Sequence, residues 1–475
     1  MRRLRRRISR YNYLPARADP CIRCRMASEI TSEPPVGRPI ITALGRCPSA
    51  LRRRKGEDKS LYLSYCRYML ADTFHDRVRF ELRSGDTWRE PWSMYAALRD
   101  HDPVHRVVPA DRPDNDYWVL TRHEHVYAAA RDTGAFSSGA GLTVEYGELE
   151  QIGLTGNPPM VMQDPPEHTE FRKLVARGFT PRQVTEVEPV VRRFVRDRLD
   201  RLATDGGGDI VADLFKPLPT MVVAHYLGVP EEDRSRFDGW TDAVVAAGTQ
   251  RTADAQAASM EMLGYFAELI KRRRTDPGDD TVSLLVQAGI GADDADVDGL
   301  VQILAYTWTM VAGGNDTTTG LLGGAVQLLQ RYPEQRAALA TDPEGIRTAI
   351  EEFARLTSPV QGLARTTTRP VELDGVTIPA GRKVLLVYGS ANRDERVFGA
   401  DAAELDIERN PQRIMTFGHG PHHCLGAAAA RMQARVALEE LLARFADHHV
   451  DIDAVTYAPG PYVRRPTSVP FRCAA

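Results

Sequence analysis

The chain has 475 residues, 43% of them hydrophobic and 26% charged, which is ordinary globular composition and enough length to enclose a cofactor in one large or two medium domains. Its 61 basic and 64 acidic residues nearly cancel, which excludes a global field directed at nucleic acid or at an anionic membrane surface. Six cysteines without regular spacing offer no disulfide framework.

Residues 1–68 are an Arg-rich extension, and residues 1–60 alone hold 14 Arg and 2 Lys against 5 acidic residues. We expect disorder there, or a start codon assigned upstream of Met69; a transit peptide is the alternative. Cys21 and Cys24 form a C-x-x-C without a second pair, which disfavours a zinc or redox site. No signal peptide and no apolar run of about 18 residues occurs. The folded domain is expected at residues 69–475, in the cytoplasm.

The first elements of this domain are predicted to be short. Residues 92–108 favour a helix followed by an extended segment, residues 118–120 a strand, and residues 122–132 an amphipathic helix. Residues 137–160 are rich in Gly and loop formers, which predicts a mobile loop over a pocket.

A Pro pair starts the next predicted helix, within residues 162–180. His168 and Arg172 are four positions apart and lie on one face of it, well placed to hold a pair of carboxylates. An ordinary solvated pair is the alternative. Residues 182–290 predict several amphipathic helices to which no specific chemistry can be assigned.

Asp294, Asp296 and Asp298, followed by Gly299, imitate the first half of an EF-hand calcium loop. The twelfth position is Ala305 instead of the required Glu, which disfavours calcium. We expect these acids to cap the positive end of the following helix instead.

That helix is predicted at about residues 299–331, a length of about 50 Å. Its centre, "AGGNDTTTG" at residues 312–320, has poor helix propensity and would bury polar side chains. Violations of this kind are expected where function resides. A kinked, purely structural helix is the alternative.

The stretch "FGHGPHHCLG" at residues 417–426 contains one cysteine, Cys424. Glycines and the small residues after them permit close approach of the backbone to a large flat group and an immediate helix start. The helix N-terminus and the N–H groups of the loop favour the thiolate, the form that binds metal. An inert buried thiol is one alternative. A zinc site from His419, His422, His423 and Cys424 is the other, disfavoured because no second thiolate is near.

This stretch resembles the haem-binding loop of the cytochrome P450 superfamily, F-G-x-G-x-H-x-C-x-G, of the soluble bacterial, actinobacterial-like type. The matching residues are Phe417, Gly418, Gly420, His422, Cys424 and Gly426. The resemblance extends over about residues 70–472. It implies a mainly α fold with a smaller β region, a helical prism around buried haem.

The resemblance also implies roles for individual residues in binding the cofactor. Cys424 would be the axial thiolate on the iron of haem b. The other implied haem contacts are His168, Arg172, Gly313, Arg365, Phe417 and His422, with His168, Arg172, Arg365 and His422 at the propionates.

Residues 313–317 resemble the oxygen-binding groove [A/G]-G-x-[D/E]-T of the superfamily. Thr317 would contact oxygen and relay protons, with Asp316 as the acid; Thr318 or Thr319 could replace Thr317. Glu352, Arg355 and Arg409 would form a buried charge network that serves folding. The residues implied beside the substrate are Thr309, Val360, Leu363, Tyr462 and Val463.

The implied activity is that of a monooxygenase, which inserts one atom of dioxygen into a small apolar or amphiphilic organic molecule. Electrons would come from an external ferredoxin and ferredoxin reductase, docking on Lys173, Arg177, Arg431 and Arg435. We expect a monomer without nucleic-acid or membrane partners. The alternatives are a haem-thiolate protein that binds a ligand or gas without turnover, and a peroxide-driven or isomerising enzyme.

Overall fold

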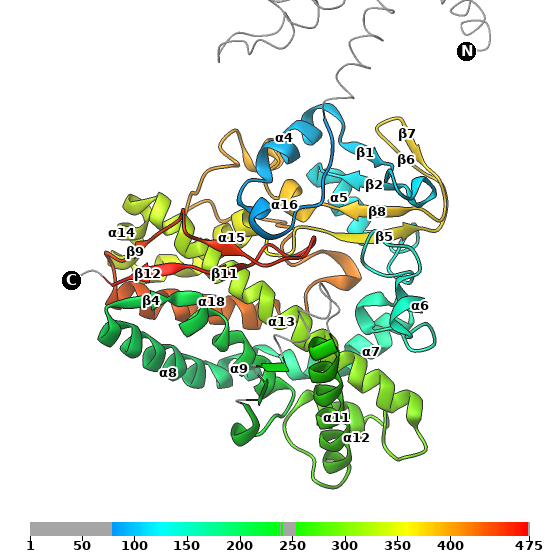
Figure 1. Ribbon diagram of the computed structural model, residues 1–475, viewed down its shortest axis with the longest axis horizontal. Coiled ribbons are helices and arrows are strands. Elements are labelled where there is room, and N and C mark those ends of the chain that lie inside the picture. The colour runs from blue at the N-terminus through cyan, green and yellow to red at the C-terminus, as the bar shows by residue number, and fades with distance from the viewer. Residues whose placement is uncertain (1–77, 235, 238, 241–252, 474–475) are drawn as a thin grey trace, which may run out of the picture. The chain divides into compact units, whose positions relative to one another are not determined.

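The computed structural model describes residues 78–234, 236–237, 239–240 and 253–473. Helices dominate this part of the chain, and the strands form small sheets at its edges (Figure 1). The expected mainly α fold with a smaller β region is therefore confirmed. The extension at residues 1–68, with Cys21 and Cys24, lies outside the described residues, and the domain start at Met69 stays a prediction.

The largest sheet has the strand order β1-β2-β8-β5-β3, in which β2 and β8 are parallel and the other neighbours antiparallel. Its strands are β1 (Val104–Val107), β2 (Tyr117–Leu120), β8 (Lys383–Leu386), β5 (Leu363–Thr367) and β3 (Phe136–Ser137). Helices α4 (Trp92–His101) and α5 (His123–Arg131) complete the region. The predicted helix, short strand at residues 118–120 and amphipathic helix are confirmed, and the segment between the first two forms a further strand, β1.

The segment predicted as a loop at residues 137–160 contains a short helix, α6 (Glu148–Ile152). Gly147 and Gly153 flank it, both with φ of 72°, a conformation that glycine adopts without strain. The carboxylate of Glu148 accepts from the backbone N–H groups of Leu142 and Thr143, each at 2.9 Å. The segment lines a cavity with Tyr146, Glu150 and Thr155, as a loop over a pocket would, and it contains one short helix as well. Its mobility stays a prediction.

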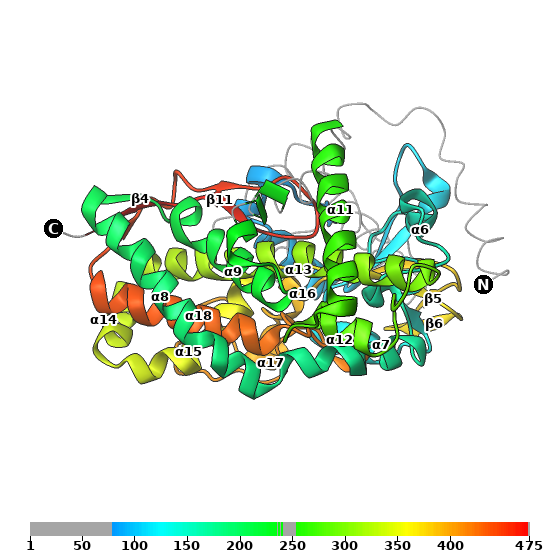
Figure 2. The ribbon, with the colours of Figure 1, turned by 90° about the horizontal axis from the view of Figure 1, so that it is seen from below.

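The helical part is built on α8 (Pro181–Asp205) and α18 (Ala427–Arg444), which lie side by side in both views (Figures 1 and 2). Valine and leucine recur along α8 at helical spacing and are buried, as an amphipathic helix requires. Between α8 and the long central helix the structure has η7 (Val211–Phe215), α9 (Pro217–Tyr226), α11 (Ala253–Thr275) and α12 (Thr281–Gln287). Within the described ranges, no helix is long and apolar enough to cross a membrane.

Helix α13 (Val297–Arg331) runs through the middle of the helical part (Figure 1). Its 35 residues span about 50 Å. Asp296 caps it: one carboxylate oxygen accepts from Gly299 N at 2.9 Å and the other from Gly291 N at 2.6 Å. The predicted capping role of this acidic segment is confirmed.

A buried charge network joins α15 (Ile346–Thr357) to the chain that follows β8. Arg355 donates to both carboxylate oxygens of Glu352, at 2.6 and 2.7 Å, and both side chains are fully buried. Arg409 donates to the same carboxylate at 3.1 Å and to Asp401. Two cations thus share one buried carboxylate, so removal of the carboxylate leaves charge uncompensated.

We expect Glu352→Gln to lower the free energy of unfolding by about 3–5 kcal/mol, the cost of breaking a buried ion pair from one side. The measurement is denaturant unfolding. Glu351→Gln is the matched control, because Glu351 is a neighbour on the same helix whose ion pair with Arg431 is partly exposed and contributes about 1 kcal/mol or less. Equal losses for the two variants would contradict the role assigned to burial.

Candidate active site

A cavity of about 300 Å³ lies between α13 and the segment at residues 416–426. Its remaining walls come from α7 (Glu167–Val175), β5 and the chain just before them. Many of the residues singled out from the sequence line it: His168, Arg172, Thr309, Gly313, Thr317, Val360, Leu363, Arg365, Phe417, His422 and Cys424. Segments far apart in the chain therefore meet at one site.

The cysteine-containing loop is held by its own backbone. Cys424 N donates to Phe417 O at 2.7 Å, and α18 begins three residues after the thiol. Gly420 has φ of 70°, and a Cβ at this position would lie 2.9 Å from Ala130 O. Only glycine therefore fits where the loop meets the end of α5.

The accessible surface of Cys424 faces the cavity. Burial raises the pKa of the Cys424 thiol, whereas the Gly426 N–H, Arg172 and Arg431 act in the opposite direction. The sequence argument that the helix start favours the thiolate is therefore outweighed by burial. A metal ion deprotonates a thiol that coordinates it, so the loop favours ligation without presenting a free thiolate.

Nitrogen donors gather at one end of the cavity without enough acceptors. His168 is 1% exposed, and neither of its ring nitrogens has a hydrogen-bond partner in the part of the chain that the structure describes. Arg172 donates to His423 O at 2.5 Å, and the buried Arg365 to Ala364 O at 2.8 Å. Buried donors without acceptors are costly, so this end fits a ligand that carries carboxylates.

Burial holds the nearby imidazoles neutral. Burial, together with the charges of Arg365 and Arg172, lowers the pKa of His422 to about 3. Burial and Arg172 also lower the pKa of His168. The two rings lie 4.2 Å apart, and Nε2 of His422 is 3.2 Å from the Ser138 hydroxyl. Neutral rings can still donate one hydrogen bond each, so the positive charge at this end comes from the two arginines.

The segment of poor helix propensity at the centre of α13 also lines the cavity. The Thr317 hydroxyl donates to Gly313 O at 2.7 Å and lines the cavity, as does Thr318. Thr319 does not line it, because its hydroxyl donates to Phe215 O and Asn315 O, each at 3.0 Å. The alternatives left open by the sequence are thus reduced to Thr317 and Thr318.

Gly313 and Gly314, in the same segment, have different structural roles. A Cβ on Gly313 would meet nothing within 4 Å, so this glycine borders open space. A Cβ on Gly314 would lie 2.5 Å from Val223, so this glycine lets α9 pack closely. Asp316 does not line the cavity; its carboxylate forms an ion pair with Arg465 at 3.0 Å.

The residues expected beside the substrate separate into two groups. Thr309, Val360 and Leu363 line the cavity. Tyr462 and Val463 do not: the Tyr462 hydroxyl accepts from Val144 N at 3.0 Å, and Val463 forms a backbone bridge with Val360. Sequence reasoning missed further lining residues, because side-chain direction in loops has no local signal: Leu142, Met160, Val161, Tyr306, Met310 and Tyr388.

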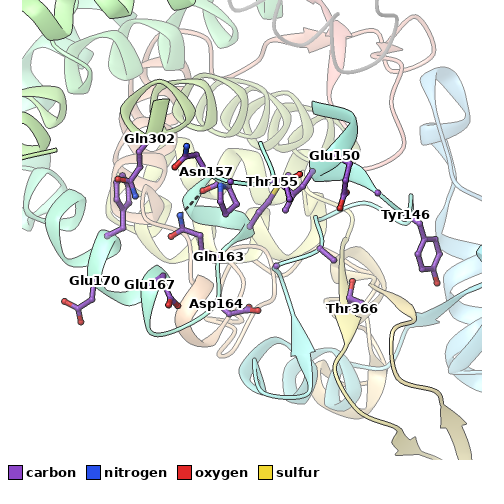
Figure 3. Close-up of a pocket in the computed structure, with 18 of the residues that line it drawn as sticks. Tyr146, Glu150, Thr155, Asn157, Gln163, Asp164, Glu167, Glu170, Gln302 and Thr366 are labelled. Carbon is purple, nitrogen blue, oxygen red and sulfur yellow. Dashed lines mark hydrogen bonds between the residues drawn. The ribbon is translucent and has the colours of Figure 1, made fainter. Parts of the chain in front are cut away.

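A second cavity, about 920 Å³, is lined in part by α7 and the residues just before it (Figure 3). Gln163, Glu167 and Glu170 line it, whereas His168 and Arg172 of the same segment line the smaller one. It contains no thiol and none of the predicted site residues. The chemistry therefore belongs to the smaller cavity.

The zinc alternative receives no support. Among residues whose placement is described, no group of three or more His, Cys, Asp or Glu side chains converges in a way that could hold a metal ion. A single thiol, flanked by donors for carboxylates and faced by a glycine-lined space, instead fits a flat cofactor with two carboxylate arms whose metal takes one protein ligand.

Comparison with known proteins agrees with this geometry. Residues 345–455 match the family model described as Cytochrome P450. The chain is 65% identical to cytochrome P450 130 of Mycobacterium tuberculosis over 395 residues, which cover 83% of this chain and 97% of that protein. The chain belongs to the cytochrome P450 family.

Other relatives of this P450 carry the names of hydroxylases and monooxygenases. Vitamin D(3) 25-hydroxylase of Pseudonocardia autotrophica is 37% identical, with coverage of 82% of this chain and 95% of that protein. The structure of PksS from the bacillaene polyketide synthase of Bacillus subtilis superimposes with a TM-score of 0.73 at 30% identity, covering 82% of this chain and 98% of that one.

Membership in the family establishes the general activity. The chain is a P450 monooxygenase, an oxidoreductase that uses haem iron bound by a cysteine thiolate. Dioxygen, small organic substrates and redox partners belong to this activity.

We expect His168→Leu to accelerate dissociation of haem about 10- to 100-fold, because one charge-assisted hydrogen bond to a propionate contributes about 1.5–3 kcal/mol. The measurement is transfer of haem to an acceptor protein. His449→Leu, an exposed histidine of β9 (His449–Val450), is the control. The reduced, carbon monoxide-treated variant should keep the optical spectrum of a thiolate ligand; an unchanged dissociation rate would contradict the placement of His168.

Proposed function

We propose that Cys424 is the axial thiolate ligand of haem b, and that the chain inserts one atom of dioxygen into a small apolar or amphiphilic molecule with electrons from an external ferredoxin and its reductase. One observation supports this most directly: Cys424 and Thr317, from segments more than 100 residues apart, line a single cavity. A cofactor bound between them would face a proton donor on the side where dioxygen binds.

The bound haem supplies the activation of dioxygen. His168, Arg172 and Arg365 would hold its propionates, since all three line the cavity and neither ring nitrogen of His168 has a hydrogen-bond partner among the described residues. Phe417 and Gly313 line the same cavity and would contact the bound cofactor. The roles of these residues fix the orientation of the cofactor.

Thr317 would deliver protons. Its hydroxyl now donates to Gly313 O at 2.7 Å, and rotation about one side-chain bond would turn it toward the cavity. After Thr317 has given up its proton, Asp316, the preceding residue, would supply a new proton to the Thr317 hydroxyl. Asp316 would take that proton from outside the cavity. Oxygen insertion with release of water requires two protons delivered to the same oxygen atom of dioxygen. Hydrogen peroxide consumes the same two electrons and two protons but has one proton on each oxygen atom. Loss of directed delivery through Thr317 should therefore divert dioxygen to hydrogen peroxide.

The cavity wall favours an apolar substrate. Leu142, Met160, Met310, Val360 and Leu363 contribute aliphatic or thioether side chains, and Thr309 adds one hydroxyl, already bonded to Ala305 O. A relative whose name gives vitamin D(3) as its substrate supports the same class of molecule.

The expected docking cations are not equally available for a ferredoxin. Arg435 pairs with Glu188 and Glu439, and Arg431 with Glu351. Lys173 pairs with Glu170 at 2.7 Å on the surface.

Arg177, in η6 (Ala176–Phe179), is exposed and forms no ion pair with the described residues. Arg131 and Arg413 were missed from the sequence; both are exposed, and both stack on Tyr127, whose ring contacts His419 of the Cys424 loop. We propose that Arg131, Arg177 and Arg413 form the docking face.

A monomeric state and a cytoplasmic location stay predictions.

We expect Thr317→Ala to lower the yield of oxygenated product per electron on the order of 10- to 100-fold, toward the lower end of what a positioned proton donor contributes. Hydrogen peroxide should rise in proportion while electron consumption continues. Thr319→Val is the matched control, because its hydroxyl is bonded away from the cavity.

The same assay separates the alternative functions. Product formed from hydrogen peroxide alone at comparable rates would favour a peroxide-driven enzyme. Binding of ligands without product under any electron supply would favour a binding protein. Equal yields for the Thr317 and Thr319 variants would remove Thr317 from the proton route.

We expect Arg177→Glu to slow reduction by ferredoxin about 10-fold at low ionic strength, because steering between opposite charges contributes at least this much to association rates. Stopped-flow reduction at several salt concentrations measures it. Arg201→Glu, an exposed site near the far end of α8, is the control. Equal rates for the two variants would discard the docking face.

A further inference from the structure

We propose that Arg465 is a positioning residue for the oxygenation reaction: it holds the Asp316 carboxylate beside Thr317, so that proton delivery depends on the C-terminal hairpin as well as on α13. The inference deepens the proposed function and rests on the proton role of Asp316 and Thr317.

The ion pair is short and well shielded. Nε of Arg465 lies 3.0 Å from a carboxylate oxygen of Asp316, and the two side chains are only 11% and 16% exposed. Charges at this distance attract one another far more strongly when water is largely excluded than they do at a protein surface. The contact is electrostatic, because Nε of Arg465 is buried and makes no hydrogen bond with the described residues. Attraction to a residue from another segment of the chain therefore favours this position of the Asp316 carboxylate.

The segment that carries Arg465 is fixed against α13 at both ends. A Cβ on Gly320 would lie 2.9 Å from Arg464 O, and one on Gly323 would lie 2.5 Å from Pro466. Glycine on α13 therefore allows the backbone on each side of Arg465 to touch the helix. Close packing of this kind fixes the backbone position from which the Arg465 side chain reaches Asp316.

The neighbouring side chain adds a second anchor. Arg464 is buried, with 9% of its surface exposed. Its guanidinium donates to Trp88 O and to the Tyr457 hydroxyl, each at 2.8 Å. Its backbone N–H donates to Pro359 O at 2.7 Å. Arg464 lies in the connection between strands β10 (Thr456–Tyr457) and β11 (Pro466–Ser468), which pair with each other.

The same segment reaches the substrate wall. Val463, two residues before Arg465, forms a backbone bridge with Val360, which lines the cavity. A single stretch of backbone thus joins the wall of the substrate space to the acid that would replace the proton on Thr317. Loss of Arg465 would free the carboxylate to leave this position, and protons would arrive more slowly.

The test is a double-mutant cycle on the haem-loaded enzyme with reduced ferredoxin and a substrate found by its spin-state shift. We expect Arg465→Gln to lower product per electron about 2- to 10-fold, the lower part of the range for coupling between residues in contact, with a matching rise in hydrogen peroxide. Arg465→Lys should recover part of the yield. Substrate affinity and the carbon monoxide spectrum should be unchanged in both.

The decisive comparison is Arg465→Gln in an Asp316→Asn background, where it should have no further effect on yield. A full effect in that background would overturn the proposal, since Arg465 would then act on something other than Asp316. Arg472→Gln, an exposed arginine of β12 (Pro470–Arg472), is the control for charge loss in the same part of the chain.

The remaining outcomes separate the inference from the proposed function. A lowered yield in Asp316→Asn together with a normal yield in Arg465→Gln would overturn only the role of Arg465. A normal yield in Asp316→Asn would overturn the proton role of Asp316, and this inference with it.

Discussion

The rest of the site depends on the buried hydrogen bonds and ion pair made by the guanidinium of Arg355. It is fully buried and donates to Glu352, and also to Asn392 O and Ala402 O at 2.7 and 2.6 Å. The Asn392 side chain in turn accepts from Met415 N at 2.6 Å. The chain immediately before the Cys424 loop is therefore fixed to α15 through one buried cation, although that cation touches nothing in the cavity.

The site combines features that ordinary folding would disfavour. His168 is buried without hydrogen-bond partners among the described residues, and the Cys424 thiol is buried enough to raise its pKa. Such groups reduce the stability of the protein alone. They persist because the charge network and the packing of α8 against α18 hold the surrounding backbone, so the unsatisfied groups stay aimed at one space.

Much of the site could be predicted from the sequence because its parts are local. The 417–426 loop, the pair formed by His168 and Arg172, and the weak centre of α13 each lie within a few turns of one segment, where spacing alone decides which side chains share a face. Arg431 and Arg435 show the limit of this reasoning. The sequence shows that both residues are charged. It does not show that they form ion pairs with Glu351 and Glu188, which belong to other helices.

By itself, the sequence determined the family, the mainly α fold, Cys424 as the one cysteine of the glycine-rich loop, and part of the set of residues that line its cavity. The tertiary structure alone decided that Tyr462 and Val463 lie outside the cavity, that Thr319 turns away from it, and that Asp316 pairs with Arg465. The physical reason is that motifs are recognised within one element, whereas burial, charge pairing and side-chain direction depend on which distant segments pack against it.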